Sequence, residues 1–186
     1  MKLYVKYMVS QRCKMIVTAE LEKLGLHAIV VHLGEIEIKE TLSNEQRERL
    51  KNALSSVGLE LVEDQKTILI EKIKATVIEL VHYSDEMPLV NYSDYISEKL
   101  NYHYTYLSNL FSETMGFTLH QFIVFHKIER IKELIIYGEL ALSQIAWKLN
   151  YSSPAHLCNQ FKKVTGYSPS QFKQLKEKRR RPLEEI

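Results

Sequence analysis

Few residues of this chain have the type and spacing that reactive chemistry requires. The thiols of Cys13 and Cys158 are suited to it, because a thiolate can act as a nucleophile or bind a soft metal ion such as Cu(I). The seven histidines show no spacing of metal ligands. No motif of a phosphate-binding loop, a dinucleotide-binding loop or an activated serine is present. These observations argue against an enzyme.

The strongest pattern is a block of polar and aromatic residues that occurs twice, fifty positions apart. Residues 107–122 and 157–172 share Leu, Asn, Phe, Gly, Gln and Phe at the same places. A second match, residues 96–102 against 145–151, lies upstream of each block and contains Leu-Asn-Tyr in both copies. Two matching blocks in the same order indicate a duplicated unit.

Each copy is predicted to form a helix, a short polar turn and a second helix. The expected helices cover residues 92–100 and 105–115 in the first copy, and 143–149 and 154–165 in the second. Gly116 and Gly166 are expected to end the second helices, and Pro154 suits a first helical turn. Residues 120–137 are predicted to form a long amphipathic helix between the copies. The second helix of such a unit can present its N-terminal residues to the DNA major groove.

Residues 1–64 are predicted to form an α+β domain. Alternating or β-branched runs predict strands at 3–9, 28–31, 35–39 and 59–62, and helical spacing predicts helices at 12–24 and 45–55. Ser43 is the expected N-cap of the second helix. The order β-α-β-β-α-β is that of the ferredoxin-like fold. Only helical periodicity follows, beginning with residues 66–83, so the domain boundary is expected at 64–66.

Composition and charge limit the class of protein. With 45% hydrophobic and 26% charged side chains among 186 residues, the chain is expected to be globular, not disordered or disulfide-stapled. Charged residues interrupt every apolar run, including the N-terminal one, so we expect no membrane span, no signal peptide and a cytoplasmic location. Residues 157–181 hold eight basic and one acidic side chain. This excess can attract a polyanion, although the run 176–181 is expected to be a solvated tail.

At the repeated blocks, the chain resembles the C-terminal DNA-binding domain of the AraC/XylS family of bacterial transcription regulators. The likeness covers about residues 68–178 and is carried by Ile145-Ala146, by residues 161–169 and by Gln171-Phe172. It implies an all-α double helix-turn-helix domain at 65–181, with units at about 90–116 and 141–172, a linker helix at about 119–137 and a tail at 182–186. One such chain would read two successive major-groove segments of double-stranded DNA.

The resemblance also implies, by position, which side chains contact DNA. Those expected to face DNA are Tyr104, Thr105, Ser108, Asn109 and Ser112 in the first unit and Ser153, Ala155, His156 and Asn159 in the second, with Lys162 and Lys163 near phosphate.

Four positions depart from the family pattern. The family usually has glycine where Asn150 stands, and a basic residue where Asn109, Asn159 and Ser112 stand. Asparagine can make two hydrogen bonds to adenine, whereas arginine prefers guanine, so an altered sequence preference and weaker phosphate attraction are expected. The alternative, that these asparagines are merely exposed polar residues, stays open.

The N-terminal half resembles a heavy-metal-associated domain, whose Met-x-Cys-x-x-Cys loop holds soft ions between two thiolates. Here Ser10 replaces the first cysteine of the loop Met8-x-Ser10-x-x-Cys13. Cys13 would therefore need Met8, His27, His32 or a second subunit as its partner in binding Cu(I). A metal-responsive regulator, a metal-handling or methyltransfer protein, and a structural cysteine all stay open.

A fourth interpretation is that this domain serves dimerisation or senses a different signal. By analogy with the family we expect a homodimer, and RNA polymerase is a further candidate partner. Aromatic side chains offer less information: Trp147 is expected in the core, and most tyrosines between residues 92 and 106 are expected to pack there too, although they could stack on nucleic acid.

Overall fold

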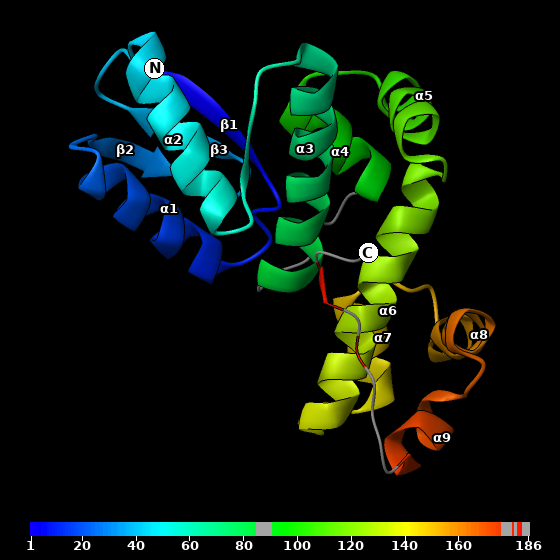
Figure 1. The fold of residues 1–186 in the computed structure, drawn as a ribbon. Coiled ribbons are helices and arrows are strands. Elements are labelled where there is room, and N and C mark those ends of the chain that lie inside the picture. The colour runs from blue at the N-terminus through cyan, green and yellow to red at the C-terminus, as the bar shows by residue number, and fades with distance from the viewer. Residues whose placement is uncertain (85–90, 176–179, 181, 184–186) are drawn as a thin grey trace. The chain divides into compact units, whose positions relative to one another are not determined.

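The computed structural model describes residues 1–84, 91–175, 180 and 182–183. The chain divides into two compact units, Met1–Thr76 and Val77–Ile186, of which the first is α+β and the second all-helical (Figure 1). This confirms the expected sequence of an α+β part followed by a helical part. The division falls inside helix α3 (Gln65–Ile78), whereas the boundary expected at residues 64–66 coincides with the start of this helix.

The first unit is built on a four-stranded antiparallel sheet. Its strands are β1 (Lys2–Lys6), β2 (Ala28–Val31), β3 (Glu35–Ile38) and β4 (Glu60–Val62), arranged in the order β2-β3-β1-β4. Leu3 pairs with Ile36, and both are buried together with Val5 and Ile38, because alternate residues of a strand point to the same face. Helices α1 (Gln11–Lys23) and α2 (Asn44–Ser56) contact each other. Their buried leucines complete this core.

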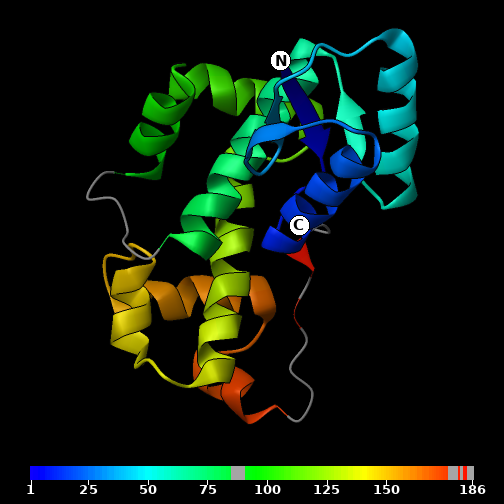
Figure 2. The same ribbon diagram turned by 90° about the vertical axis from the view of Figure 1, so that its left-hand side faces the viewer.

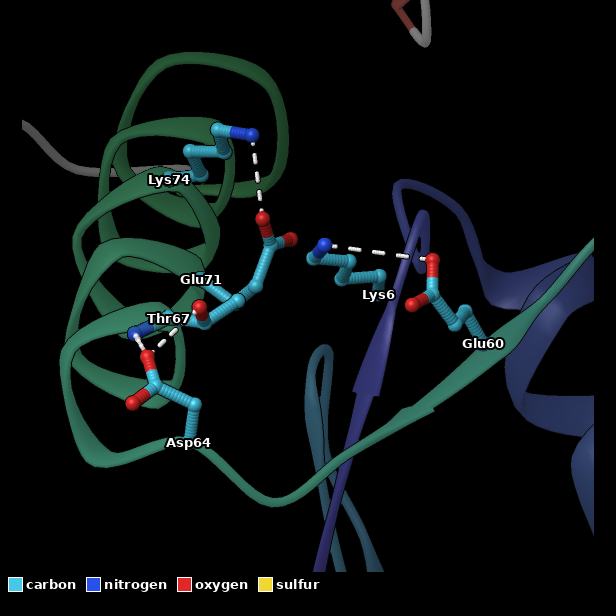
Figure 3. A network of polar contacts seen from close by, with 6 residues as sticks. All are labelled: Lys6, Glu60, Asp64, Thr67, Glu71 and Lys74. Carbon is cyan, nitrogen blue, oxygen red and sulfur yellow. Dashed lines mark hydrogen bonds and ion pairs between the residues drawn. The ribbon is translucent and has the colours of Figure 1, made fainter. Parts of the chain in front are cut away.

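Polar side chains fix the start of α3, as Figure 3 shows. One carboxylate oxygen of Asp64 accepts hydrogen bonds from the backbone N–H and the hydroxyl of Thr67, both at 2.8 Å. These bonds hold the pKa of Asp64 below its usual value. One turn later, Lys74 donates to Glu71 at 3.0 Å. The cap lets the chain pass from β4 into α3 within two residues.

The second unit is organised around one long helix, α6 (Leu119–Tyr137). A π-helical turn, η1 (Glu79–Tyr83), continues α3 and contacts α6. Helices α4 (Tyr92–Leu100) and α5 (Tyr104–Met115) lie at the N-terminal end of α6, and α7 (Leu142–Lys148), α8 (Pro154–Thr165) and α9 (Pro169–Gln174) lie at its other end (Figures 1 and 2). Among the described residues, no helix is long and apolar enough to cross a membrane.

Matching positions of the repeat fill matching places in the two helix-turn-helix units. Leu107 and Phe111 on α5 are fully buried, and so are Leu157 and Phe161 on α8. Aromatic contacts tie each second helix to its neighbours: the rings of Phe111 and Phe122 lie 5.2 Å apart, and those of Phe161 and Phe172 5.6 Å apart. The duplicated sequence therefore builds a duplicated core.

Two expectations about the helices require revision. Trp147 is 82% exposed, so its assignment to the core was wrong. In the short helix α7 the neighbouring Ile145 and Ala146 supply the buried face, and each further residue turns by about 100° away from it. The helix α9 was not predicted, although Ser168 and Gln171 form a capping box at its start and Pro169 occupies its first turn.

Asparagine occupies the turn of both helix-turn-helix units because the backbone there is left-handed. Asn101 has φ +58° and Asn150 has φ +52°. Only glycine adopts this conformation without cost, and asparagine tolerates it better than other side chains. The asparagine at position 150, where the AraC/XylS pattern has glycine, is therefore compatible with the same turn.

Replacing Asn150 with alanine should destabilise the protein by about 1 kcal/mol, because the left-handed backbone disfavours a Cβ without a compensating polar group. Asn150→Gly should leave the free energy of unfolding nearly unchanged. Urea denaturation measures both, with Asn159→Ala on the exposed face of α8 as the control for removing an asparagine side chain. Equal stability of Asn150→Ala and Asn159→Ala would contradict the role of the turn.

Candidate nucleic-acid interface

The N-terminal parts of α5 and α8, together with Lys162 and Lys163, form what we call the reading surface. Of the side chains that were expected to contact DNA, those exposed to solvent are Thr105, Asn109, Ala155, His156, Asn159, Lys162 and Lys163. Those half-buried are Tyr104, Ser108, Ser112 and Ser153. The first group is free to meet a ligand without any rearrangement of the helices.

On α8, local hydrogen bonds set the helix start and orient one side chain of the reading surface. The Ser153 hydroxyl accepts from the backbone N–H of His156 at 3.1 Å, and Pro154 occupies the first turn. The Nδ1 atom of His156 lies 3.0 Å from the Ser152 hydroxyl, and its ring meets the ring of Tyr151 edge to face at 5.3 Å. The other ring nitrogen, Nε2, is thereby the one that can bond to a ligand.

On α5, the half-buried positions are engaged with their own helix. Ser112 donates its hydroxyl proton to the carbonyl of Ser108 at 2.7 Å. Burial raises the pKa of the Tyr104 hydroxyl, so this group stays protonated near neutral pH. Ser112 therefore presents at most an acceptor, where a family member would place a positive charge.

The two helix-turn-helix units differ in charge. Residues 90–116 hold one lysine and the carboxylates of Asp94, Glu98 and Glu113, and the lysine, Lys99, is paired with Glu79 at 2.7 Å. Residues 141–172 hold three lysines and no acidic residue. Attraction of DNA phosphates should therefore come chiefly from the second helix-turn-helix unit.

Two tyrosines that were expected in the core, with stacking on nucleic acid as the alternative, lie at the start of α5: Tyr102 in the preceding turn and Tyr106 on the helix. The rings of Tyr102 and Tyr106 stack at 5.6 Å with an angle of 25°, and each is about half exposed. Together with Tyr104, Asp94 and Glu98 they line an open depression. The assignment of most tyrosines to the core is thus wrong for this pair. The signal in the sequence was an aromatic pair four residues apart at a helix start.

The run of basic residues at 176–181, which was expected to be a tail that can touch phosphate, lies outside the described residues except for Arg180. Arg180 lies 3.6 Å from Glu133 of α6. Residues 184–186 of the expected tail also lie outside the described part.

Cys13, the candidate metal ligand, stands near the start of α1 in the first unit. Its sulfur lies 3.4 Å from the Ser10 hydroxyl and 3.8 Å from the carbonyl oxygen of Tyr7. Of the suggested partner ligands, Met8 is buried, and His27 is bonded to Glu40 through Nδ1 at 2.6 Å. Within the described residues, no group of three or more His, Cys, Asp or Glu side chains gathers in a metal-binding arrangement. Binding of Cu(I) at Cys13 stays a prediction.

Between η1 and α6, two histidines form a buried hydrogen-bonded pair. Nε2 of His82 on η1 lies 3.1 Å from Nδ1 of His126 on α6, and His126 is completely buried. Burial lowers the pKa of both histidines to about 3, with smaller contributions from Arg130 and Arg180 at His82. Both rings are therefore neutral near pH 7, and in this state one ring donates its N–H and the other accepts it.

Comparison with known proteins finds a domain match inside the second compact unit, Val77–Ile186. A family described as helix-turn-helix domain matches residues 96–175. The chain is 26% identical over 160 residues to the uncharacterized HTH-type transcriptional regulator YtdP of Bacillus subtilis, a match that covers 81% of this chain. It is 29% identical over 93 residues, or 50% of its length, to the uncharacterized HTH-type transcriptional regulator SACOL0084 of Staphylococcus aureus.

These relatives are much longer, because the matches span only 20% and 12% of their own lengths. Among solved structures, the C-terminal domain of AraT, a response regulator from Geobacillus stearothermophilus, matches with a TM-score of 0.51 and 21% identity. This match covers 64% of the present chain and 92% of that domain, and it establishes similarity of fold.

The buried histidine pair predicts that the protein loses stability in mild acid. Unfolded histidines bind protons near pH 6.5, whereas His82 and His126 do so only near pH 3, so protonation below about pH 6.5 favours the unfolded chain. Their contribution is fully present above that pH. Between about pH 7.5 and pH 5 it should fall by about 2 kcal/mol for each histidine.

Urea denaturation at the two pH values tests this prediction. His126→Leu should remove about half of the pair's pH dependence, because one of the two titrating groups is lost. His120→Gln, an exposed histidine on the same helix, serves as the control and should leave the dependence unchanged. An unaltered pH dependence in His126→Leu would refute the assignment.

Proposed function

We propose that this chain is a sequence-specific DNA-binding transcription regulator of the AraC type, because residues 96–175 match a helix-turn-helix domain family and the chain is similar to a protein described as a transcriptional regulator. The observation that carries the proposal is the repeated unit itself. Two second helices, α5 and α8, are held by equivalent buried residues against one helix and expose their N-terminal side chains. Each would enter a separate major-groove segment of double-stranded DNA.

In this proposal the domain at 65–181 contains the units at about 90–116 and 141–172, joined by the linker helix at about 119–137. Residue 90 and the neighbouring residues 85–89 lie outside the described part of the chain. Asn109 and Asn159 occupy matching exposed positions and would bond adenine, while Lys162 and Lys163 would contact phosphate. The remaining expected contacts, Tyr104, Thr105, Ser108, Ser112, Ser153, Ala155 and His156, surround these four.

The N-terminal compact unit, Met1–Thr76, is proposed to be a ferredoxin-like domain that senses a signal or pairs two chains. Its element order and its strand order, β2-β3-β1-β4, support that class. The pairing of chains is supported by strand β2, which lies at the edge of the sheet and exposes Ile29 at 54% and Val30 at 38%. An apolar edge strand is a ready site for pairing with another chain.

We expect a homodimer in sedimentation equilibrium at micromolar concentration, weakened about tenfold or more by Ile29→Lys, because an edge lysine opposes strand pairing. Glu22→Lys, an exposed site on α1, is the control for added positive charge. A wild-type protein that stays monomeric would contradict this part of the proposal.

A DNA-binding regulator acts where the chromosome is, so the proposal places the chain in the bacterial cytoplasm and gives it no catalytic role. RNA polymerase is the predicted partner for a role in activating transcription. The location, the lack of a catalytic role and the partner all follow from the proposed function and fail with it.

The direct experiment is selection of binding sites from a random duplex library with the purified chain, followed by footprinting on the selected sequence. Two protected segments should appear on one face of the duplex, about 10 base pairs apart. Asn109→Ala and Asn159→Ala should each relax the preference at one adenine by about tenfold, since a bidentate contact is worth about 1–3 kcal/mol.

Asn52→Ala, an exposed asparagine of α2, is the matched control and should leave the preference unchanged. A single protected segment would refute the model of two readers. Unchanged specificity in both asparagine variants would instead mean that these side chains are only exposed polar residues of their helices.

The unequal charge of the two units predicts an unequal salt dependence. Each lysine that contacts phosphate contributes about 0.9 to the slope of log affinity against log salt concentration. Replacing both Lys162 and Lys163 with alanine should therefore lower the slope by nearly two. Lys99→Ala in the first unit should change it little, because this lysine is already paired with Glu79. Fluorescence anisotropy over a range of salt concentrations measures the slopes, and equal changes in the two variants would count against the charge argument.

A further inference from the structure

One lysine is buried at the point where both helix-turn-helix units meet helix α6. Lys127 is only 8% exposed. Its ammonium nitrogen lies 3.8 Å from the centre of the Tyr151 ring and 5.0 Å from the centre of the Tyr92 ring. Both distances are within the range at which a cation is attracted to the face of an aromatic ring.

A buried lysine requires such a partner, because an ammonium removed from water is costly unless its charge is compensated. The carboxylates of α6 are engaged elsewhere: Glu129 accepts from Lys132, and Glu133 accepts from Arg130, each at 2.6 Å. Burial lowers the pKa of Lys127 to about 8, which still leaves it mostly protonated at neutral pH. Burial also raises the pKa of both tyrosines, so their rings remain neutral phenols.

The two rings come from different helix-turn-helix units. Tyr92 is the first residue of α4, in the first helix-turn-helix unit. Tyr151 follows the left-handed turn of the second unit, and its hydroxyl donates to the side-chain oxygen of Gln160 on α8 at 2.6 Å. The ring of His156, at the start of α8, also lies against Tyr151. A continuous chain of contacts thus runs from α4 through Lys127 to the reading helix α8.

We propose that Lys127 is a positioning residue that fixes the orientation of the two reading helices relative to each other and thereby sets the spacing of the two DNA segments. The second half of this statement rests on the proposed function. The first half does not, because it concerns the free protein. The apolar cores fasten each unit to its own end of α6, whereas Lys127 is held by rings from both.

Spacing is sensitive to this orientation because DNA is helical. Each base pair inserted between the two segments turns one of them by about 35° relative to the other. A rigid pair of readers would reject such a change, whereas a pair free to rotate would tolerate it. When geometry forbids simultaneous binding of two linked modules, the gain from linking them is lost, and that gain is commonly a hundredfold or more.

The first experiment measures the distance between the reading helices without DNA. Nitroxide labels at Glu113→Cys on α5 and Lys163→Cys on α8, in a background of Cys13→Ser and Cys158→Ser, are examined by double electron–electron resonance. With Lys127 present, one narrow distance is expected. Lys127→Met keeps the apolar stem and removes the charge, and it should give a distribution about twice as broad, as when several orientations replace one.

Two further variants control the result. Lys132→Met removes a lysine of the same helix that is paired with Glu129, and it should leave the distribution narrow. Tyr92→Leu removes the ring on the side of the first unit and should broaden it. This variant keeps the test decisive if Lys127→Met does not fold. A narrow, unshifted distance in a folded Lys127→Met or Tyr92→Leu protein would overturn the proposal.

The second experiment uses the duplex obtained by binding-site selection, with one base pair added or removed between its two segments. The unmodified chain and Lys132→Met should lose about tenfold or more in affinity for the altered spacings. Lys127→Met should bind all spacings within about threefold of one another. Lowered affinity with the spacing preference intact would show a merely structural role and overturn the proposal. If selection with the unmodified chain recovers no duplex, the proposed function fails, while the distance measurement still decides the role of Lys127.

Discussion

The compact unit Val77–Ile186 depends on the burial of one helix, α6, against two separate groups of helices. Eleven of the nineteen residues of α6 are buried, including His126, Lys127 and Glu129. An amphipathic surface helix normally has a single apolar stripe, and α6 exceeds this because it has neighbours on several sides. Most polar groups in this interior have partners in aromatic rings, in each other or in ion pairs, whereas Nε2 of His126 and Nε of Arg130 are buried without a hydrogen-bond partner among the described residues. The positions of both reading helices follow from this arrangement.

The duplicated units share a core but differ on their surfaces. Buried Leu and Phe recur at matching positions of α5 and α8, since each short helix pair needs the same contacts to hold its angle. The exposed faces have diverged: the first carries tyrosines and acidic side chains, and the second carries lysines without acidic side chains. A contact that relies on ring faces and one that relies on charge respond differently to salt. In the proposed function, the two helix-turn-helix units would therefore have unequal tasks on one DNA site, the first in local fit and the second in electrostatic attraction.

The N-terminal compact unit, Met1–Thr76, offers a different set of surfaces. Its sheet leaves an apolar edge at β2, and its only candidate for metal chemistry among the described residues is the neighbourhood of Cys13, where Ser10 stands within hydrogen-bond distance of the sulfur. The hydroxyl of serine is a poor ligand for the soft ions that thiolates prefer. The proposed pairing of chains through this edge therefore fits the chemistry of the unit better than the binding of a soft metal ion does. The chain leaves the unit along α3, which Asp64 caps and η1 continues.

The sequence by itself determined the local elements. The periodicity of residues 92–100 and 154–165 predicted α4 and α8 with the bounds that the structure has, because amphipathic spacing, a proline in the first turn and a glycine at the end act within a few residues. The left-handed turns at Asn101 and Asn150 and the cap at Ser43 are local in the same sense. Tertiary structure alone decided which residues the elements bury. Periodicity marks a face but does not say what covers it: Trp147 shares a helix with buried residues and stays exposed, while Lys127 and His126 are buried because their partners come from helices distant in the sequence.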